Sequence, residues 1–216
     1  MSYRCLRGAA LSLLTSAGFQ AWAQSPPSID PPVYQVGDSW TWDVTVNPRD
    51  KCTDGISTGA QEIHVVTATT DQGYIVDVAG PQAGSRTERI YQKDLSYETS
   101  LNDKSVKTKL VTFPLGAGGP WDTTLVNKSS GVVTTLTCES GRAELVKVGM
   151  QEFDTTPITC KGKWQNLSSG NNDTATYKYW YSSAVGNFVR RTVFTYFRGG
   201  ACADIEYRLA AYKHAG

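Results

Sequence analysis

The segment TYKYWYSSAVGNFVRRTVFTYF at residues 176–197 decides the fold class that the sequence predicts. Aromatic and β-branched residues fill its first part, 176–181, and its last part, 188–197, and both classes favour strands. Residues 182–187 between them carry Ser, Gly and Asn, which are typical of a turn. The two runs are therefore expected to pair as an antiparallel hairpin.

Similar strand patterns extend through most of the chain. Residues 40–46 (WTWDVTV) alternate strictly between apolar and polar, as in a strand with one buried face. Further β-branched or aromatic runs occur at 62–68, 74–78, 87–91, 106–113, 121–127, 132–138, 143–148, 155–163 and 203–212. Beyond residue 23 no helix-length periodicity is found, and only residues 93–102 could hold a short helix. We expect an all-β fold: a single curved antiparallel sheet, a half-barrel or open sandwich, of about ten strands.

The first 23 residues have the layout of a secretory signal peptide. Arg4 and Arg7 form a basic start, an apolar stretch follows, and residues 21–23 read Ala-Trp-Ala, as at an A-x-A cleavage site. The apolar stretch is too short and too often interrupted for a transmembrane helix, which needs roughly 20 apolar residues. We expect an exported protein, periplasmic or secreted, with no transmembrane segment.

The remaining chain is expected to contain an extended leader and one β domain. Residues 24–32 carry four prolines and form the leader, and residues 33–216 form the domain. Two Gly- and Trp-containing entries into strands, at residues 36–41 and 118–123, suggest two pseudo-repeats. Their bounds would be 33–112 and 113–212. Chance similarity among strands is the alternative, and the sequence leaves it open.

The charge of the chain gives no sign of a nucleic-acid partner. Loss of residues 1–23 leaves 19 Lys and Arg against 20 Asp and Glu. A nearly neutral chain lacks the basic surface that binds nucleic acid, so we expect no such partner.

Four cysteines follow the signal peptide: Cys52, Cys138, Cys160 and Cys202. An even number in an oxidising compartment predicts two disulfides. Proximity in sequence favours Cys138 with Cys160, which leaves Cys52 with Cys202, although two other connectivities stay open. No close pair such as C-x-x-C is present, so we expect neither a metal nor another cofactor.

Catalytic motifs are not found. The chain has no S-x-x-K dyad and no phosphate-binding loop, and its one G-x-S-x-G pattern, at residues 55–59, precedes a β-branched run and not the helix that a nucleophile elbow requires. Glu62 and His64 share a strand face and could do acid–base work, or they could simply be two polar residues on a half-exposed face. We therefore assign no catalytic residue, and an unrecognised hydrolase remains an alternative to a non-enzymatic function.

The aromatic residues are the remaining candidates for a site. Tyr179 and Tyr181 oppose Trp180 across their strand, so one face of this strand lies away from the main core unless both are buried. Trp42, Tyr179 and Tyr181 are the predicted ligand-binding residues of a concave aromatic surface. Cross-strand packing of the same rings is the alternative. Arg190 and Arg191 fall on opposite faces, where one is expected to stack over a ring.

Residues 179–190 resemble a W-Y-S-x-x-V-G-x-x-V-[KR] hairpin that is common in exported bacterial proteins of unknown function. Residues 113–121 and 146–153 are similar to the segments that precede this hairpin, and the likeness spans roughly residues 106–197. Several such families resemble the half-barrel of periplasmic lipoprotein carriers, which implies a curved sheet with an apolar concave face. The chain departs from the carriers in having four cysteines and no covering helices.

These observations predict an exported, non-enzymatic binding protein. Its aromatic concave face would hold an apolar small molecule, a lipid or another envelope component. The alternative is an envelope protein–protein interaction module without a ligand cavity. An aromatic cavity would favour the first function, and a filled core with an exposed apolar patch would favour the second.

Overall fold

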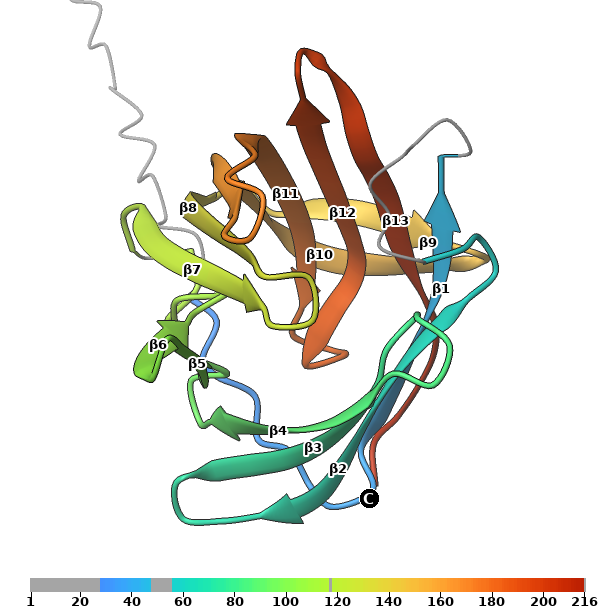
Figure 1. Ribbon diagram of the computed structural model, residues 1–216. Helices are drawn as coiled ribbons and strands as arrows, with labels where there is room; N and C mark the ends of the chain where they lie inside the picture. Colours follow the sequence, from blue (N-terminus) through green and yellow to red (C-terminus); the bar gives the residue numbers. More distant parts are fainter. Residues whose placement is uncertain (1–27, 48–55, 117, 216) are drawn as a thin grey trace, which may run out of the picture.

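The computed structural model describes residues 28–47, 56–116 and 118–215 (Figure 1). All regular secondary structure in these ranges is β-strand. The strands are β1 (Ser39–Val46), β2 (Gln61–Thr69), β3 (Gly73–Ala79), β4 (Arg86–Gln92), β5 (Tyr97–Leu101), β6 (Lys104–Thr108), β7 (Trp121–Asn127), β8 (Val132–Ser140), β9 (Glu144–Val148), β10 (Gln151–Asn166), β11 (Asn172–Ser182), β12 (Asn187–Phe197) and β13 (Gly200–Lys213). The expected all-β, curved antiparallel sheet is confirmed, with 13 strands in place of about ten.

One continuous sheet contains all of these strands. Its order is β6-β5-β4-β3-β2-β1-β13-β12-β11-β10-β8-β7, and β9 pairs with β10 outside this path. The sheet curls so far that its two edges, β6 and β7, meet (Figure 1). Thr108 Oγ1 donates to the carbonyl of Thr124 at 2.6 Å, and the indole N–H of Trp121 donates to the carbonyl of Lys109 at 3.1 Å. Side-chain hydrogen bonds therefore complete the closure that strand pairing begins.

The strand β1 lies within the sheet, and its alternating sequence buries one of its two faces. It pairs with β2 on one side and with β13 on the other. Trp40 and Trp42 are buried, and their indole N–H groups donate to the carbonyls of Val185 at 2.9 Å and Phe188 at 2.8 Å. The first strand is thereby fastened to the β11–β12 hairpin, which follows more than 140 residues later.

A second layer covers part of the convex side. In Figure 1, β9 and the start of β10 cross behind β12 and β13. Val146 and Phe153 from this hairpin join the hydrophobic core, and Trp180 packs against the same cluster. The indole N–H of Trp180 also donates to Glu144 at 2.6 Å. The convex face of β11 is therefore packed against β9 while its other face lines the concave side, which explains why both faces carry rings.

The predicted Cys138–Cys160 disulfide is confirmed. The two residues lie directly opposite each other in β8 and β10. Cys202 is also disulfide-bonded, and its expected partner Cys52 lies outside the described residues.

Removal of the Cys138–Cys160 bond is expected to destabilise the protein. The bond closes a loop with a sequence separation of 22, so its loss frees the unfolded chain. We expect the Cys138→Ala/Cys160→Ala variant to lose about 3 kcal/mol of unfolding free energy. Urea denaturation of the variant and of the wild-type protein measures the difference. Equal stability of the two proteins would contradict the expectation.

The described part of the leader contacts the segment between β6 and β7. Ile29 forms an isolated antiparallel bridge with Leu115. Residues 1–27 lie outside the described ranges, so the signal peptide stays a prediction, as do the pseudo-repeats. The described residues contain no helix with the length and apolar character needed to span a bilayer.

Candidate functional site

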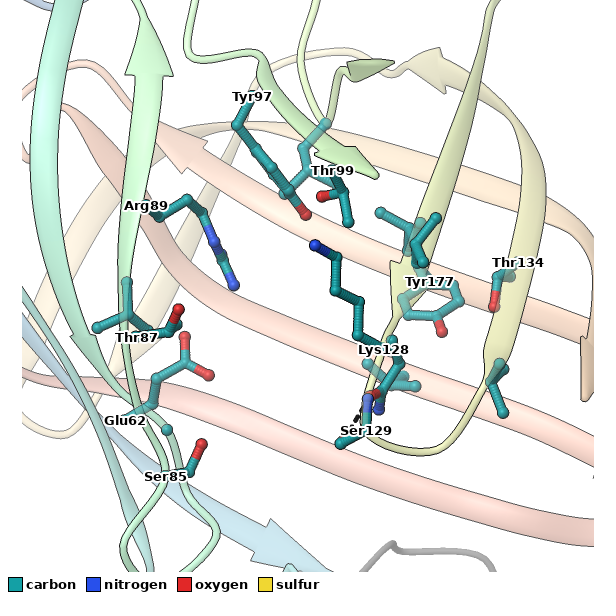
Figure 2. A pocket seen from close by; sticks show the side chains of 18 of the residues that line it. Glu62, Ser85, Thr87, Arg89, Tyr97, Thr99, Lys128, Ser129, Thr134 and Tyr177 are labelled. Atoms are coloured by element: carbon teal, nitrogen blue, oxygen red, sulfur yellow. Dashed lines mark hydrogen bonds between the residues drawn. The ribbon is translucent and has the colours of Figure 1, made fainter. Parts of the chain in front are cut away.

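A cavity of about 2070 Å³ lies on the concave side of the sheet. It is open to solvent, and strands from both halves of the chain form its walls. Figure 2 shows side chains from β2, β4, β5, β8 and β11, and from the β7–β8 turn, around this space. The predicted concave surface is therefore hollow rather than filled.

Strand alternation gives the cavity floor its chemistry. Residues two apart in β11, β12 and β13 project to the same side, so they form rows across the sheet. The register produces two such rows along the floor: Tyr179–Arg191–Tyr207 and Tyr177–Val193–Ile205. The first row is polar and aromatic, and the second is mainly apolar.

A buried ion cluster lies at the polar row. Glu62 Oε1 accepts hydrogen bonds from His64 Nε2 and from Arg191 Nη2, each at 2.8 Å. The Glu62 and Arg191 side chains are only 12% and 15% exposed. The guanidinium of Arg191 lies 4.2 Å from the ring centroid of Tyr207 and 4.9 Å from that of Trp42. The arginine is thus held between rings and a carboxylate.

Burial and charge determine the protonation states of this cluster. Burial alone would raise the pKa of Glu62, but Arg191 and the hydrogen bond to His64 outweigh it and hold this pKa far below its ordinary value. Burial lowers the pKa of His64, and the nearby Glu62 only partly opposes that effect. At neutral pH Glu62 is therefore ionised, and a neutral His64 donates to it from Nε2. A carboxylate with so low a pKa is a weak general base, so the arrangement fits an ion pair better than acid–base chemistry.

The neutral state of His64 predicts a pH-dependent stability. The unfolded chain takes up a proton near pH 6.5, whereas the folded chain does so only at lower pH. Stability must therefore fall as the pH drops through 6.5, by up to about 1.4 kcal/mol per pH unit. Urea denaturation between pH 8 and 5.5 measures this loss.

The variant His64→Gln keeps a hydrogen-bond donor for Glu62 and removes the titration. We expect it to lose less stability over that pH range than the wild-type protein. Identical slopes for His64→Gln and the wild type would contradict the assignment.

Arg89 projects into the cavity from β4 (Figure 2). Its Nη1 donates to the hydroxyl of Tyr91 at 3.0 Å, and its guanidinium carbon lies 4.7 Å from the ring centroid of Tyr97. No carboxylate within the described ranges lies at ion-pair distance from it. Lys128 extends from the β7–β8 turn, across the cavity from Arg89, toward Tyr97 (Figure 2).

The three predicted ligand-binding residues occupy different depths. Tyr179 lines the cavity. Trp42 lies beneath Arg191 and outside the lining. Tyr181 is also outside it and packs against the rings of Phe113 and Phe188, after a register shift between Trp180 and Tyr181. The structure therefore brings one of the three to the cavity surface.

Sequence reasoning missed Arg89. The signal was present, because Arg89 and Tyr91 alternate with exposed residues in β4. Arg190 and Arg191 do fall on opposite faces, and both stack over rings: Arg190 lies over Trp180 at 4.8 Å, and Arg191 lies over Tyr207.

Comparisons of the chain with protein-family models, with curated proteins and with solved structures found no match. The resemblance to exported proteins and lipoprotein carriers therefore stays a prediction. In the part of the chain that the structure describes, no group of three or more His, Cys, Asp and Glu residues is arranged to hold a metal ion.

Proposed function

We propose that the chain is an exported binding protein that holds an apolar or amphipathic small molecule in its concave cavity. The cavity of about 2070 Å³ carries this proposal. Ligand pockets for drug-sized molecules usually enclose roughly 300–1,000 Å³, so the space suits a molecule of lipid size. Tyrosine rings and aliphatic side chains on its floor offer contacts to an apolar body.

The distribution of the core supports a binding function over a packed interaction module. Two hydrophobic clusters stabilise the sheet, one around Trp40 and Trp42 and the other around Ile158 and the Cys138–Cys160 bond. The concave space between them is left open. Export is supported by the signal-like N-terminus and by a disulfide, since disulfides persist in oxidising compartments.

A neutral apolar fluorophore tests the proposal. N-phenyl-1-naphthylamine should bind saturably, with a rise in emission as it leaves water. Val193→Trp places a bulky ring on the cavity floor, so we expect it to weaken binding at least tenfold, or by about 1.4 kcal/mol. Fluorescence titration of each protein gives the dissociation constants.

Thr192→Trp is the matched control, because residue 192 precedes Val193 on the same strand and faces the convex side. It should bind the fluorophore like the wild-type protein. Circular dichroism checks that both variants fold. Absence of saturable binding to the wild-type protein, or equal weakening by both variants, would exclude the cavity as the binding site.

A further inference from the structure

We propose that the cavity selects ligands with one anionic headgroup on an apolar body, and that Arg89 together with Arg191 forms the headgroup site. This inference rests on the proposed binding function and specifies its ligand class. The headgroup would be a carboxylate or a group of similar charge. The apolar body would extend along the floor away from the two arginines.

The four ionisable side chains Arg89, Arg191, Glu62 and His64 together carry one net positive charge at neutral pH. Arg89 and Arg191 each carry one, Glu62 carries one negative charge, and His64 is neutral. Glu62 is already satisfied by Arg191 and His64. A partly desolvated cation without a counter-ion is unfavourable, and a bound anion would remove that cost.

Other charged residues around the cavity do not supply that counter-ion. Asp94 lies 3.8 Å from both Lys107 and Lys109, and Glu98 accepts a hydrogen bond from Ser105. The remaining charged lining residues are Asp71, Glu88, Lys93 and Lys128. Glu88 alternates with Arg89 in β4 and projects to the opposite face. Asp71 lies in the β2–β3 turn, whereas Lys128 adds a further positive charge at the cavity (Figure 2).

The surroundings of Arg89 hold it in place and leave donors available. Tyr97 stacks on the guanidinium, and Tyr91 accepts one hydrogen bond from Nη1. A guanidinium has five N–H donors, and its planar edge can bind a carboxylate through two parallel hydrogen bonds. Among the described residues, Nε and Nη2 of Arg89 have no hydrogen-bond partner. These donors are the ones that an anion would meet.

Tyrosines near the arginines can add donors. Burial raises the pKa of Tyr207 to about 12, and it raises the pKa of Tyr97 and Tyr179 as well. All three hydroxyls therefore stay protonated at neutral pH. A phenol O–H that cannot ionise donates to an anion and does not repel it.

The floor beside this polar row is apolar. The row Tyr177–Val193–Ile205 lies next to the row that contains Arg191, one alternation further along the strands. Leu125, Trp164 and Phe197 continue the lining beyond it. A headgroup at the arginines would therefore place an attached chain over apolar side chains. The proposed ligand accordingly has one charged end and one apolar end.

Isothermal titration calorimetry with three ligands of equal chain length tests the inference. Decanoate, 1-decanol and decylammonium differ only in the headgroup; the two ions are used below their micelle concentrations and 1-decanol below its solubility limit. We expect decanoate to bind, decanol to bind at least tenfold more weakly, and decylammonium to bind most weakly. Acetate, which has the headgroup alone, should show no measurable binding.

Arg89→Gln should weaken decanoate binding at least tenfold and leave decanol binding unchanged. Arg86→Gln is the matched control, because Arg86 lies on the same strand, faces outward and pairs with Asp77. It should bind decanoate like the wild type. Equal affinities for decanoate and decanol, or no effect of Arg89→Gln, would overturn the headgroup site and leave the apolar cavity standing. Binding of neither ligand would overturn both proposals.

Discussion

Replacement of Arg191 by Met is expected to lower the unfolding free energy by about 3–5 kcal/mol. Arg191 is the cation that compensates Glu62, and both side chains are largely buried. Without Arg191, the ionised Glu62 would retain only the neutral His64 as a partner. Glu62 would then either stay charged without compensation or take up a proton, and both outcomes destabilise the folded state. Urea denaturation at pH 7 measures the loss.

Two further variants separate charge from packing. Arg190→Met is the matched control, because Arg190 directly precedes Arg191, faces the convex side and has a side chain that is 37% exposed. We expect it to cost less than about 1 kcal/mol, as for a surface ion pair. The double variant Glu62→Gln/Arg191→Met removes both buried charges and should recover most of the stability. A double variant as unstable as Arg191→Met alone would show that packing, and not charge, explains the loss.

Replacement of Trp42 by Ala is expected to cost about 3–5 kcal/mol of unfolding free energy. Trp42 is 1% exposed, and its indole N–H donates to the carbonyl of Phe188. Its ring also lies against Arg191. Loss of the ring leaves a cavity, an unpaired carbonyl and a less constrained arginine. Thermal and urea denaturation measure the effect.

Trp164→Ala is the control for that variant, because Trp164 lines the cavity and is only half-buried. We expect a smaller loss of stability than for Trp42→Ala, together with weaker ligand binding. A Trp42→Ala protein with wild-type stability and abolished binding would contradict the structural role of Trp42. It would instead support direct ligand contact by this residue.

Sequence pattern alone predicted β1 and the β11–β12 hairpin. Residues 40–46 lie in β1, whose alternation is strict because one face is buried, and residues 176–197 lie in the hairpin, where aromatic and β-branched runs flank a turn. The strand β5 was not predicted, the run expected at residues 106–113 overlaps only the end of β6, and residues 93–102 do not form a helix. The exposed, polar residues of β5 and β6 carry little periodic signal; β5 pairs with β6, and β6 contacts β7 at the sheet edge.

The candidate site was less accessible to sequence reasoning, since its contacts join distant segments. Glu62 and Arg191 are 129 residues apart, and their strands are brought close by the pairing of β2 with β1, of β1 with β13 and of β13 with β12. Both Tyr179 and Tyr181 pack against Phe188, but the register shift in β11 falls between Trp180 and Tyr181, and Tyr181 does not line the cavity. Alternation predicts which face a residue occupies, but it cannot predict such bulges or the depth of a side chain in the cavity.

Nuclear magnetic resonance of the ¹⁵N-labelled protein during titration with decanoate tests the central claim most directly, because it locates the bound ligand. We predict saturable shifts of amide signals around the cavity, at Arg89, Tyr179, Arg191 and Val193. Signals of β9, which lies on the convex side and contributes no residue to the cavity, should change least. Shifts confined to the convex face, or no saturable shift at any amide, would contradict a binding function for the cavity.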